Sequence, residues 1–333
     1  MKSADGVFLW VRLVVRSLLD GVRHRSSLPA LKEKLHLIPK GLDSLFDKMF
    51  NDINPAERRR SDRMLVLAAY HNYDKNALLY SWLEDLEDPD FPYDVPINAY
   101  SDEELKDRHT NVRAQLDSLS KGLLEMKPWV WARQENSGAL ALKDIYFRYV
   151  VDFFHRSVRD YITDTVRYAA IKGRLGDFDS AQEYRRLVLA EFKFARTKND
   201  YFKDEASPLR ACFINIFRRI SPESKEISPR ILDECGKILE HHRRNPFSHP
   251  DETNRNSGAI YWGLSYSTKR GNLQWTNDDI SYPQWLAFSG QRNYVMTHFM
   301  STETLTPPVH DLCLLLASSI FPRDHTPGLF VTC

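Results

Sequence analysis

With 333 residues, of which 42% are hydrophobic and 27% charged, the chain has the composition of a globular protein and not of a disordered one. Its 46 basic and 45 acidic residues leave a net charge of +1, so no overall field would attract nucleic acid or an anionic membrane. Glycine, at 13 residues, is too scarce for a Gly-rich β architecture.

The cysteines and the N-terminus both indicate a cytoplasmic protein. The four cysteines, Cys212, Cys235, Cys313 and Cys333, form no CxxC pair, which favours reduced thiols over a disulfide framework. The apolar run at residues 7–15 contains an arginine and is shorter than the roughly 20 residues that span a bilayer. We therefore interpret it as part of a helix and not as a signal peptide.

The first predicted helix covers residues 5–23. Arg12, Arg16, Asp20 and Arg23 recur at spacings of four, four and three, so they form one polar stripe on an otherwise apolar helix. This pattern predicts that most of the helix surface is buried. A helix that needs partners on several sides is unusual at an N-terminus, so we expect that further sequence precedes it in a parent protein.

The next segments have helical periodicity up to residue 120. Pro39 and Gly41 separate two amphipathic helices, and a Pro-rich acidic loop is expected over 88–100. Ser101 and Glu104 have the spacing of a capping box. The predicted helices cover residues 28–38, 42–53, 56–70, 76–87 and 101–120.

The pattern then changes to β structure. A short strand is predicted at 122–126, and residues 145–154 are dense in aromatic and β-branched side chains. Three helices followed by a two-stranded hairpin is the order of a winged-helix domain. Ser157 is predicted to cap the following helix, with Asp160 at its N3 position.

Beyond residue 170 the chain is predicted to be helical again, and the fold class is mainly α. The helices are expected at 180–195, 208–220, 228–242 and 312–321. The expected organisation is a small helical domain over 1–55, a winged-helix-like domain with a small β-hairpin over 56–168, a C-terminal helical domain over 169–321 and a disordered tail over 322–333.

Four blocks of sequence resemble a known family. They are Ala4-Asp-Gly-Val-Phe-Leu-Trp-Val continuing through Leu18-Leu-Asp-Gly, then Leu31 to Leu35 with Ile38-Pro39 and Leu42 to Phe46, then Lys121-Gly-Leu-Leu-Glu, and finally Val151-Asp-Phe-Phe-His-Arg-Ser-Val-Arg-Asp-Tyr-Ile. In this order they resemble the region that follows the nucleotide-binding core in fungal NACHT proteins, NLR-like signalling ATPases of the STAND class. The resemblance covers about residues 4–165. It implies a small helical domain followed by a winged-helix-like domain of unknown function.

The sequence departs from that family in one respect. It contains no Gly-x-x-x-x-Gly-Lys-Ser/Thr motif, which is the loop that cradles phosphates in such ATPases. The resemblance therefore implies an accessory part without enzyme activity, cofactor or metal. The partner would be another protein or a missing NACHT core, and we expect neither nucleic-acid nor membrane binding.

His155 is the candidate site residue that the resemblance singles out. In related ATPases a similar histidine contacts the β-phosphate of bound ADP, so His155 would sense nucleotide only if a core is supplied. The alternative is a local hydrogen bond between strand and helix, which we favour for this chain alone. Arg156, Arg159 and Asp160 beside it are expected to form local ion pairs.

Other clusters have simpler interpretations than binding sites. Arg58-Arg59-Arg60 could mark DNA binding, but nearby acids favour a solvated helix face. Cys235, His241 and His242 lack the spacing of a zinc site. The acidic run at 84–90 lacks the alternation of a calcium loop, so a solvated turn is expected.

The predicted function is therefore a non-catalytic, protein-interacting regulatory part of a NACHT-type signalling NTPase. A DNA-binding winged-helix regulator is the first alternative, and a helical hydrolase with an unrecognised site is the second. The apolar N-terminal helix would expose a sizeable patch unless the rest of the chain or a partner covers it.

Overall fold

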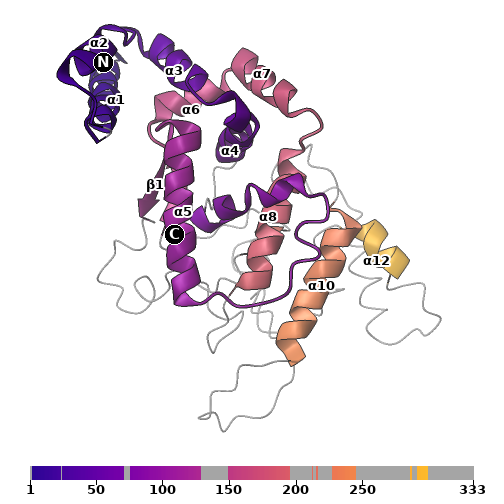
Figure 1. Cartoon of the computed structure of the whole chain (residues 1–333). Coiled ribbons are helices and arrows are strands. Elements are labelled where there is room, and N and C mark those ends of the chain that lie inside the picture. Colours follow the sequence, from indigo (N-terminus) through magenta and orange to yellow (C-terminus); the bar gives the residue numbers. More distant parts are fainter. Residues whose placement is uncertain are drawn as a thin grey trace, which may run out of the picture. The chain divides into compact units, whose positions relative to one another are not determined.

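The computed structural model describes residues 2–23, 25–70, 76–128, 149–195, 227–244 and 291–298, together with residues 212, 215, 216 and 286. In these residues the chain is mainly helical, with a single two-stranded antiparallel hairpin, as the fold class predicted (Figure 1). The helix predicted at 312–321, the tail and most of 208–220 lie outside the described residues. No described helix is both long and apolar enough to cross a membrane.

The chain divides into two compact units. The first contains Met1–Glu87 and Ser101–Ser180, and the second contains Asp88–Tyr100 and Ala181–Cys333. The chain therefore passes between the units at three points, and the predicted loop at 88–100 belongs to the second unit. The finer subdivision expected after residues 55 and 168 stays a prediction.

Three helices open the first unit: α1 (Lys2–Arg23), α2 (Leu28–His36) and α3 (Leu42–Asn51). Ser27 caps α2 by accepting a hydrogen bond from the Ala30 amide, and a proline stands in its first turn. The buried side chains of α3 are Leu45 and Phe46. These boundaries agree with the periodicity of the sequence.

Helix α4 (Arg58–Tyr70) follows the 3₁₀ turn η1 (Pro55–Glu57) and is the most deeply buried helix of the first unit. Its residues from Met64 to Val66 and Ala68 have no exposed surface. A helix this apolar over its middle turns forms the centre of a core, and α5 and α7 pack against it.

The single α-helix predicted over 76–87 is wrong. The structure has two short 3₁₀ segments instead, η2 (Ala77–Trp82) and η3 (Asp85–Glu87). Asn76 forms a β-bridge with Val150, and its side chain accepts a hydrogen bond from the Leu78 amide. Because of this bridge, the segment begins in an extended conformation. Five of the six residues of η2 are buried, whereas an amphipathic helix would bury only one face.

Helix α5 (Asp102–Ser120) begins at the predicted capping box. The Glu104 amide donates to Ser101 Oγ at 3.1 Å, and the Ser101 amide donates to the Glu104 carboxylate at 2.6 Å. The helix ends at Lys121, which has a left-handed backbone, and Gly122 follows with φ +89°. The fully buried Ser120 hydroxyl accepts a hydrogen bond from the Leu124 amide, which fixes the turn from helix to strand.

Strands β1 (Leu124–Pro128) and β2 (Tyr149–Phe153) form the hairpin, in a register that pairs Leu124 with Phe153 and Pro128 with Tyr149. Both lie within or beside the segments predicted as strands. Helices α6 (Arg156–Thr163) and α7 (Thr165–Leu175) follow. The N-cap of α6 is His155, so Ser157 lies at N2 and Asp160 lies inside the helix. The prediction that Ser157 caps the helix was therefore wrong by two residues, because the imidazole occupies the capping position.

The described part of the second unit contains α8 (Ser180–Phe194), α10 (Pro229–Arg244) and the short α12 (Arg292–His298). The predicted inner face of this helix is buried: Tyr184, Leu187, Val188 and Phe192 lie in α8, and Ala195 directly follows it. Helix α10 buries Ile231, Leu232, Cys235 and Ile238 at spacings of a single helix face.

Candidate functional site

Two arginines hold α1 against the hairpin region of the first unit. The Arg16 guanidinium donates to Asp117 at 2.6 Å and lies 3.2 Å from the point where a Cβ on Gly122 would stand. The Arg12 guanidinium lies 4.0 Å from the centre of the Phe154 ring, a cation–π arrangement. Arg12 and Arg16, two members of the predicted polar stripe, therefore make contacts within the unit.

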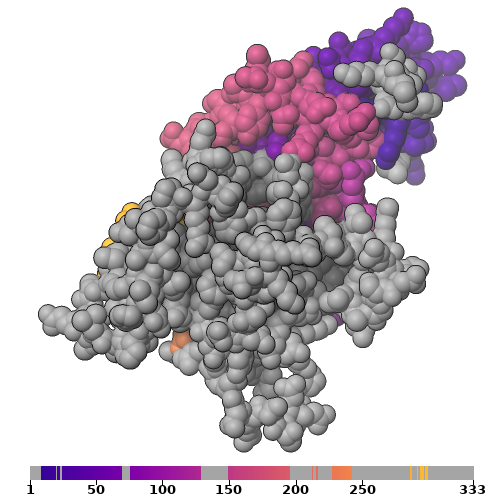
Figure 2. Space-filling model, turned by 180° about the vertical axis from the view of Figure 1, so that it is seen from behind, coloured from indigo at the N-terminus to yellow at the C-terminus, as the bar shows by residue number. Residues whose placement is uncertain are grey.

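The other N-terminal helices complete this assembly. The Trp10 indole donates to the Pro39 carbonyl at 2.6 Å, and Tyr161 of α6 donates to the Asp47 carboxylate of α3. Burial, together with Asp47, raises the pKa of Tyr161. All four blocks that carry the family resemblance thus lie in one unit and contact one another. In Figure 2, indigo and violet atoms of the N-terminal helices adjoin pink atoms of the chain after residue 149.

Replacing Gly122 is expected to loosen the contact that holds α1. Gly122→Ala forces a side chain into a left-handed backbone, at a cost of about 1–2 kcal/mol, and pushes against the Arg16 guanidinium. We expect a lower free energy of unfolding and faster hydrogen exchange in α1. Gly173→Ala in α7 is the matched control, since no atom lies within 4 Å of the added Cβ and alanine favours helix. Equal protection of α1 in the wild type and Gly122→Ala would contradict the expectation.

A face of α1 next to these arginines exposes apolar side chains, which corrects the prediction that most of the helix is buried. Leu9, Leu13 and Val14 are buried, but a second face is open. It consists of Val11, Val15, Leu19 and Val22, which are 46–56% exposed. These four residues, called the α1 stripe below, recur at spacings of four, four and three and so lie along one face over about three turns.

Further apolar residues are exposed in the chain just after α1. Leu28 is 65% exposed, Leu35 is 41% exposed and Leu37 is 62% exposed. Isolated exposed apolar residues are common on protein surfaces, but a row of them on one helix marks a contact surface. The α1 stripe is therefore the candidate functional site of the described residues.

His155 has a local structural role in the described unit. Its Nδ1 accepts a hydrogen bond from the Ser157 amide at 3.1 Å and lies 3.1 Å from the Ser157 hydroxyl. Because Nδ1 accepts from a backbone N–H, the neutral ring carries its proton on Nε2. This is the strand-to-helix hydrogen bond that the sequence suggested, and the nucleotide-sensing role stays a prediction.

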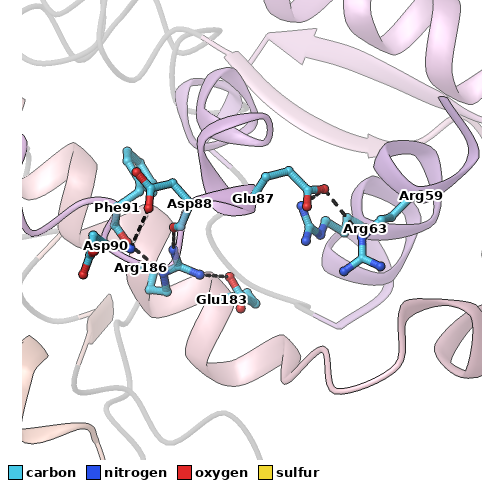
Figure 3. Close-up of polar contacts among 8 residues, drawn as sticks. All are labelled: Arg59, Arg63, Glu87, Asp88, Asp90, Phe91, Glu183 and Arg186. Atoms are coloured by element: carbon cyan, nitrogen blue, oxygen red, sulfur yellow. Dashed lines mark hydrogen bonds and ion pairs between the residues drawn. The ribbon is translucent and has the colours of Figure 1, made fainter. Parts of the chain in front are cut away.

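The basic run of α4 is engaged inside the first unit, so the predicted solvated face is wrong for part of it. Arg58 donates to the Phe50 carbonyl at 2.6 Å, and Arg60 pairs with Glu84. Figure 3 shows Arg59 and Arg63 directed at Glu87, at 3.5 and 2.5 Å. The Arg63 side chain is only 5% exposed. Arginines that are paired in this way are poorly placed to neutralise DNA phosphates.

The acidic run at 84–90 forms a solvated turn, as predicted, and three of its exposed carboxylates also serve as counter-ions. Glu84 and Glu87 pair with α4 arginines in the first unit, while Asp90 pairs with Arg230 at 2.8 Å in the second. Also within the second unit, Arg186 of α8 donates to the carbonyls of Asp88 and Phe91 and to the Glu183 carboxylate (Figure 3). One guanidinium thus anchors the start of the 88–100 segment to α8.

Lys193 anchors the rest of the 88–100 segment. Its ammonium donates to the Tyr93 and Val95 carbonyls at 3.1 and 2.8 Å and to Glu234 of α10 at 2.8 Å. The Lys193 side chain is only 2% exposed. All three ammonium protons are used, so this buried cation is fully compensated.

The Lys193–Glu234 pair predicts acid sensitivity in the second unit. Burial opposes ionisation of Glu234, but hydrogen bonds from Lys193 and Lys237 outweigh it and lower the pKa of Glu234 from its usual 4.5. A carboxylate with a lowered folded-state pKa contributes stability above pH 4.5 that is lost as the pH falls below that value. We expect Glu234→Gln to reduce the urea midpoint at pH 7 far more than at pH 3. A difference that is the same at both pH values would contradict this.

The described Cys235 and His241 of α10 belong to no cluster of possible metal ligands. Cys235 is fully buried, and burial raises the pKa of its thiol, whereas His241 is exposed. No group of three or more possible metal ligands occurs among the described residues. Cys212 and Cys235 are both buried.

The middle of this chain matches a family model. Residues 52–203 match the model of a family described as a domain of unknown function, DUF7791. No curated protein and no solved structure matches this chain. The matched region contains two of the four blocks, those at 121–125 and 151–162, and runs from the residues before α4 through α8. The family description names no activity, so the NACHT resemblance remains an expectation.

Several structurally important residues were not found by sequence reasoning. They are Asp47, Asp62, Arg174, Arg186, Lys193 and Glu234. Each is a charged residue in a helix, and charged residues are usually exposed to solvent. Each has a partner that is distant in the sequence. No local signal distinguishes such a residue from a surface charge.

Proposed function

We propose that this chain is a non-catalytic regulatory module of a NACHT-type signalling NTPase and acts by protein–protein contact through the α1 stripe. The observation that carries the proposal is the row of Val11, Val15, Leu19 and Val22, each 46–56% exposed on one face of α1. Burying such side chains from water is favourable by about 25 cal/mol per Å² of apolar area. A surface of this kind is stabilised when a partner covers it.

The assembly behind the stripe supports a regulatory role. Helix α1 is held by Arg12 on Phe154, which follows β2, and by Arg16 on Asp117 of α5, so a partner bound to α1 would act on elements that contact the hairpin directly. A partner that binds α1 in one arrangement of these elements shifts the population toward that arrangement. Switch ATPases use layers of this kind to control their nucleotide-binding cores.

No observation favours the DNA-binding alternative, because the arginines of the α4 run are already engaged by Phe50, Glu84 and Glu87. In the proposed role the isolated chain binds no ADP, since it has no phosphate-binding loop of the P-loop type. Isothermal titration with ADP measures this directly. Binding or turnover of nucleotide by the purified chain would contradict the non-catalytic part of the proposal.

Site-specific photo-cross-linking tests the contact itself. A photoreactive amino acid placed at Val15 in the full chain, in the cells that naturally produce it, is expected to give a discrete cross-linked product. The matched control is Val166 on α7, which is 76% exposed but lies outside the α1 stripe. Mass spectrometry of the Val15 product identifies the partner.

The two cross-linking positions distinguish binding of a partner at the α1 stripe from simple exposure of a side chain to solvent. A product at Val15 and none at Val166 supports the proposal. Equal labelling at both positions, or none at Val15, would show that the α1 stripe has no partner in the cell.

A further inference from the structure

The exposed face of α1 has the pattern of a two-helix seam. Val11, Val15 and Val22 of the α1 stripe, together with Leu18, recur at spacings of four, three and four, which is the d, a, d, a order of a heptad. Three of them are 46–56% exposed, and Leu18 is half-buried. Valine at both a positions and leucine at a d position favour a seam between two helices. The shape of this face therefore suits one additional helix.

The chemistry of the face favours a protein helix over a lipid surface. All the exposed large apolar residues described in α1 and α2 are valines and leucines. The aromatic residues of α1 are Phe8 and Trp10, and Trp10 is half-buried and donates its indole N–H to the Pro39 carbonyl. Helices that lie on membranes usually place tryptophan or phenylalanine among the acyl chains.

The charge of the N-terminal segment defines the partner further. Residues 1–40 contain eight Lys and Arg residues against three Asp and Glu residues, a net charge of +5 in a chain whose total is +1. Arg12 occupies the e position next to Val11 and is 67% exposed, although it is 3.7 Å from Glu125. Residues at e form ion pairs with g residues across a seam. Two copies of this basic segment would repel each other, which argues against self-association through it.

From these observations we propose that the α1 stripe binds a partner helix that has apolar residues at heptad spacing and Asp or Glu residues at the flanking positions. This inference rests on the proposed function and specifies the chemistry of the partner. The apolar seam supplies affinity, and the acidic flank facing Arg12 selects the partner and its orientation.

The test uses a synthetic probe and the full chain. The probe is a fluorescent three-heptad peptide with leucine at a and d and glutamate at e and g. The matched probe has the same seam with lysine at e and g. Anisotropy is expected to give at least about tenfold tighter binding of the glutamate peptide at low salt, and less discrimination at 1 M salt, where charges are screened.

Variants locate the binding on the protein. Val15→Asp is expected to abolish binding of the glutamate peptide, whereas Val166→Asp on α7 leaves it unchanged. Arg12→Glu is expected to reverse the preference, so that the lysine peptide binds more tightly than the glutamate peptide. Arg12→Gln, which introduces no repulsion with Glu125, is expected to reduce the preference without reversing it. Circular dichroism establishes that each variant keeps its helices.

The results separate this inference from the proposed function. Preference for the lysine peptide, equal binding of both peptides, or binding of phosphatidylserine vesicles but of neither peptide would overturn the inference. Each of these is compatible with a specific cross-link at Val15. Loss of that cross-link, in contrast, would remove the proposed function itself.

Discussion

Arg174→Met is expected to lower the free energy of unfolding of the first unit by about 3–5 kcal/mol. Asp62 in α4 has no exposed surface, and Arg174 of α7 contacts both of its carboxylate oxygens, at 2.7 and 2.9 Å. Removing the guanidinium leaves a buried carboxylate without its ion-pair partner. Urea denaturation, with hydrogen exchange in α4 and α7 to localise the loss, measures the effect.

A double variant separates loss of the ion pair from loss of packing. In Asp62→Leu combined with Arg174→Met no unpaired charge remains, so this protein is expected to be more stable than Arg174→Met alone. If the double variant is as unstable as the single variant or less stable, packing of the arginine stem explains the loss and the ion-pair argument is wrong.

Lys193→Met is expected to have a comparable effect in the second unit, about 3–5 kcal/mol. The substitution removes the donor for the Tyr93 and Val95 carbonyls and takes one of two lysine partners from Glu234. Hydrogen exchange in α8 and α10 is expected to accelerate, and the 88–100 segment is expected to become sensitive to protease.

Lys237→Met is the matched control for this prediction. Lys237 contacts the same Glu234 at 2.7 Å, but its side chain is 67% exposed. Exposed ion pairs contribute less than about 1 kcal/mol, so Lys237→Met is expected to change stability little. Similar losses in the two variants would mean that burial of Lys193 does not determine its contribution.

Local signals in the sequence predicted much of the secondary structure. The capping box at Ser101 and Glu104 depends on residues three positions apart, so it can be recognised without the fold. The inner face of α8 follows from apolar spacing alone. By contrast, the Asp62–Arg174 contact joins residues 112 positions apart, and no local pattern indicates that this aspartate is buried.

The error over α1 has a different origin. Hydropathy predicts that a side chain avoids water, but it does not say whether the cover comes from the same chain or from another one. Leu13 and Val14 are covered within the unit, whereas the neighbouring Val15 is 48% exposed. The hydropathy of α1 therefore predicted correctly that its side chains need apolar contacts. It did not show that some of these contacts are missing within the described part of the chain.

The three chain passages between the units limit how this protein can be divided. Neither unit is a continuous stretch of sequence, because Asp88–Tyr100 interrupts the first unit and belongs to the second. A recombinant fragment that stops before α8 would carry the 88–100 segment without Arg186 and Lys193, the two side chains that bind its backbone carbonyls. Truncated proteins that retain the hairpin should therefore also retain α8 and α10. Without them, the backbone carbonyls of the 88–100 segment lose their hydrogen-bond donors, which promotes aggregation.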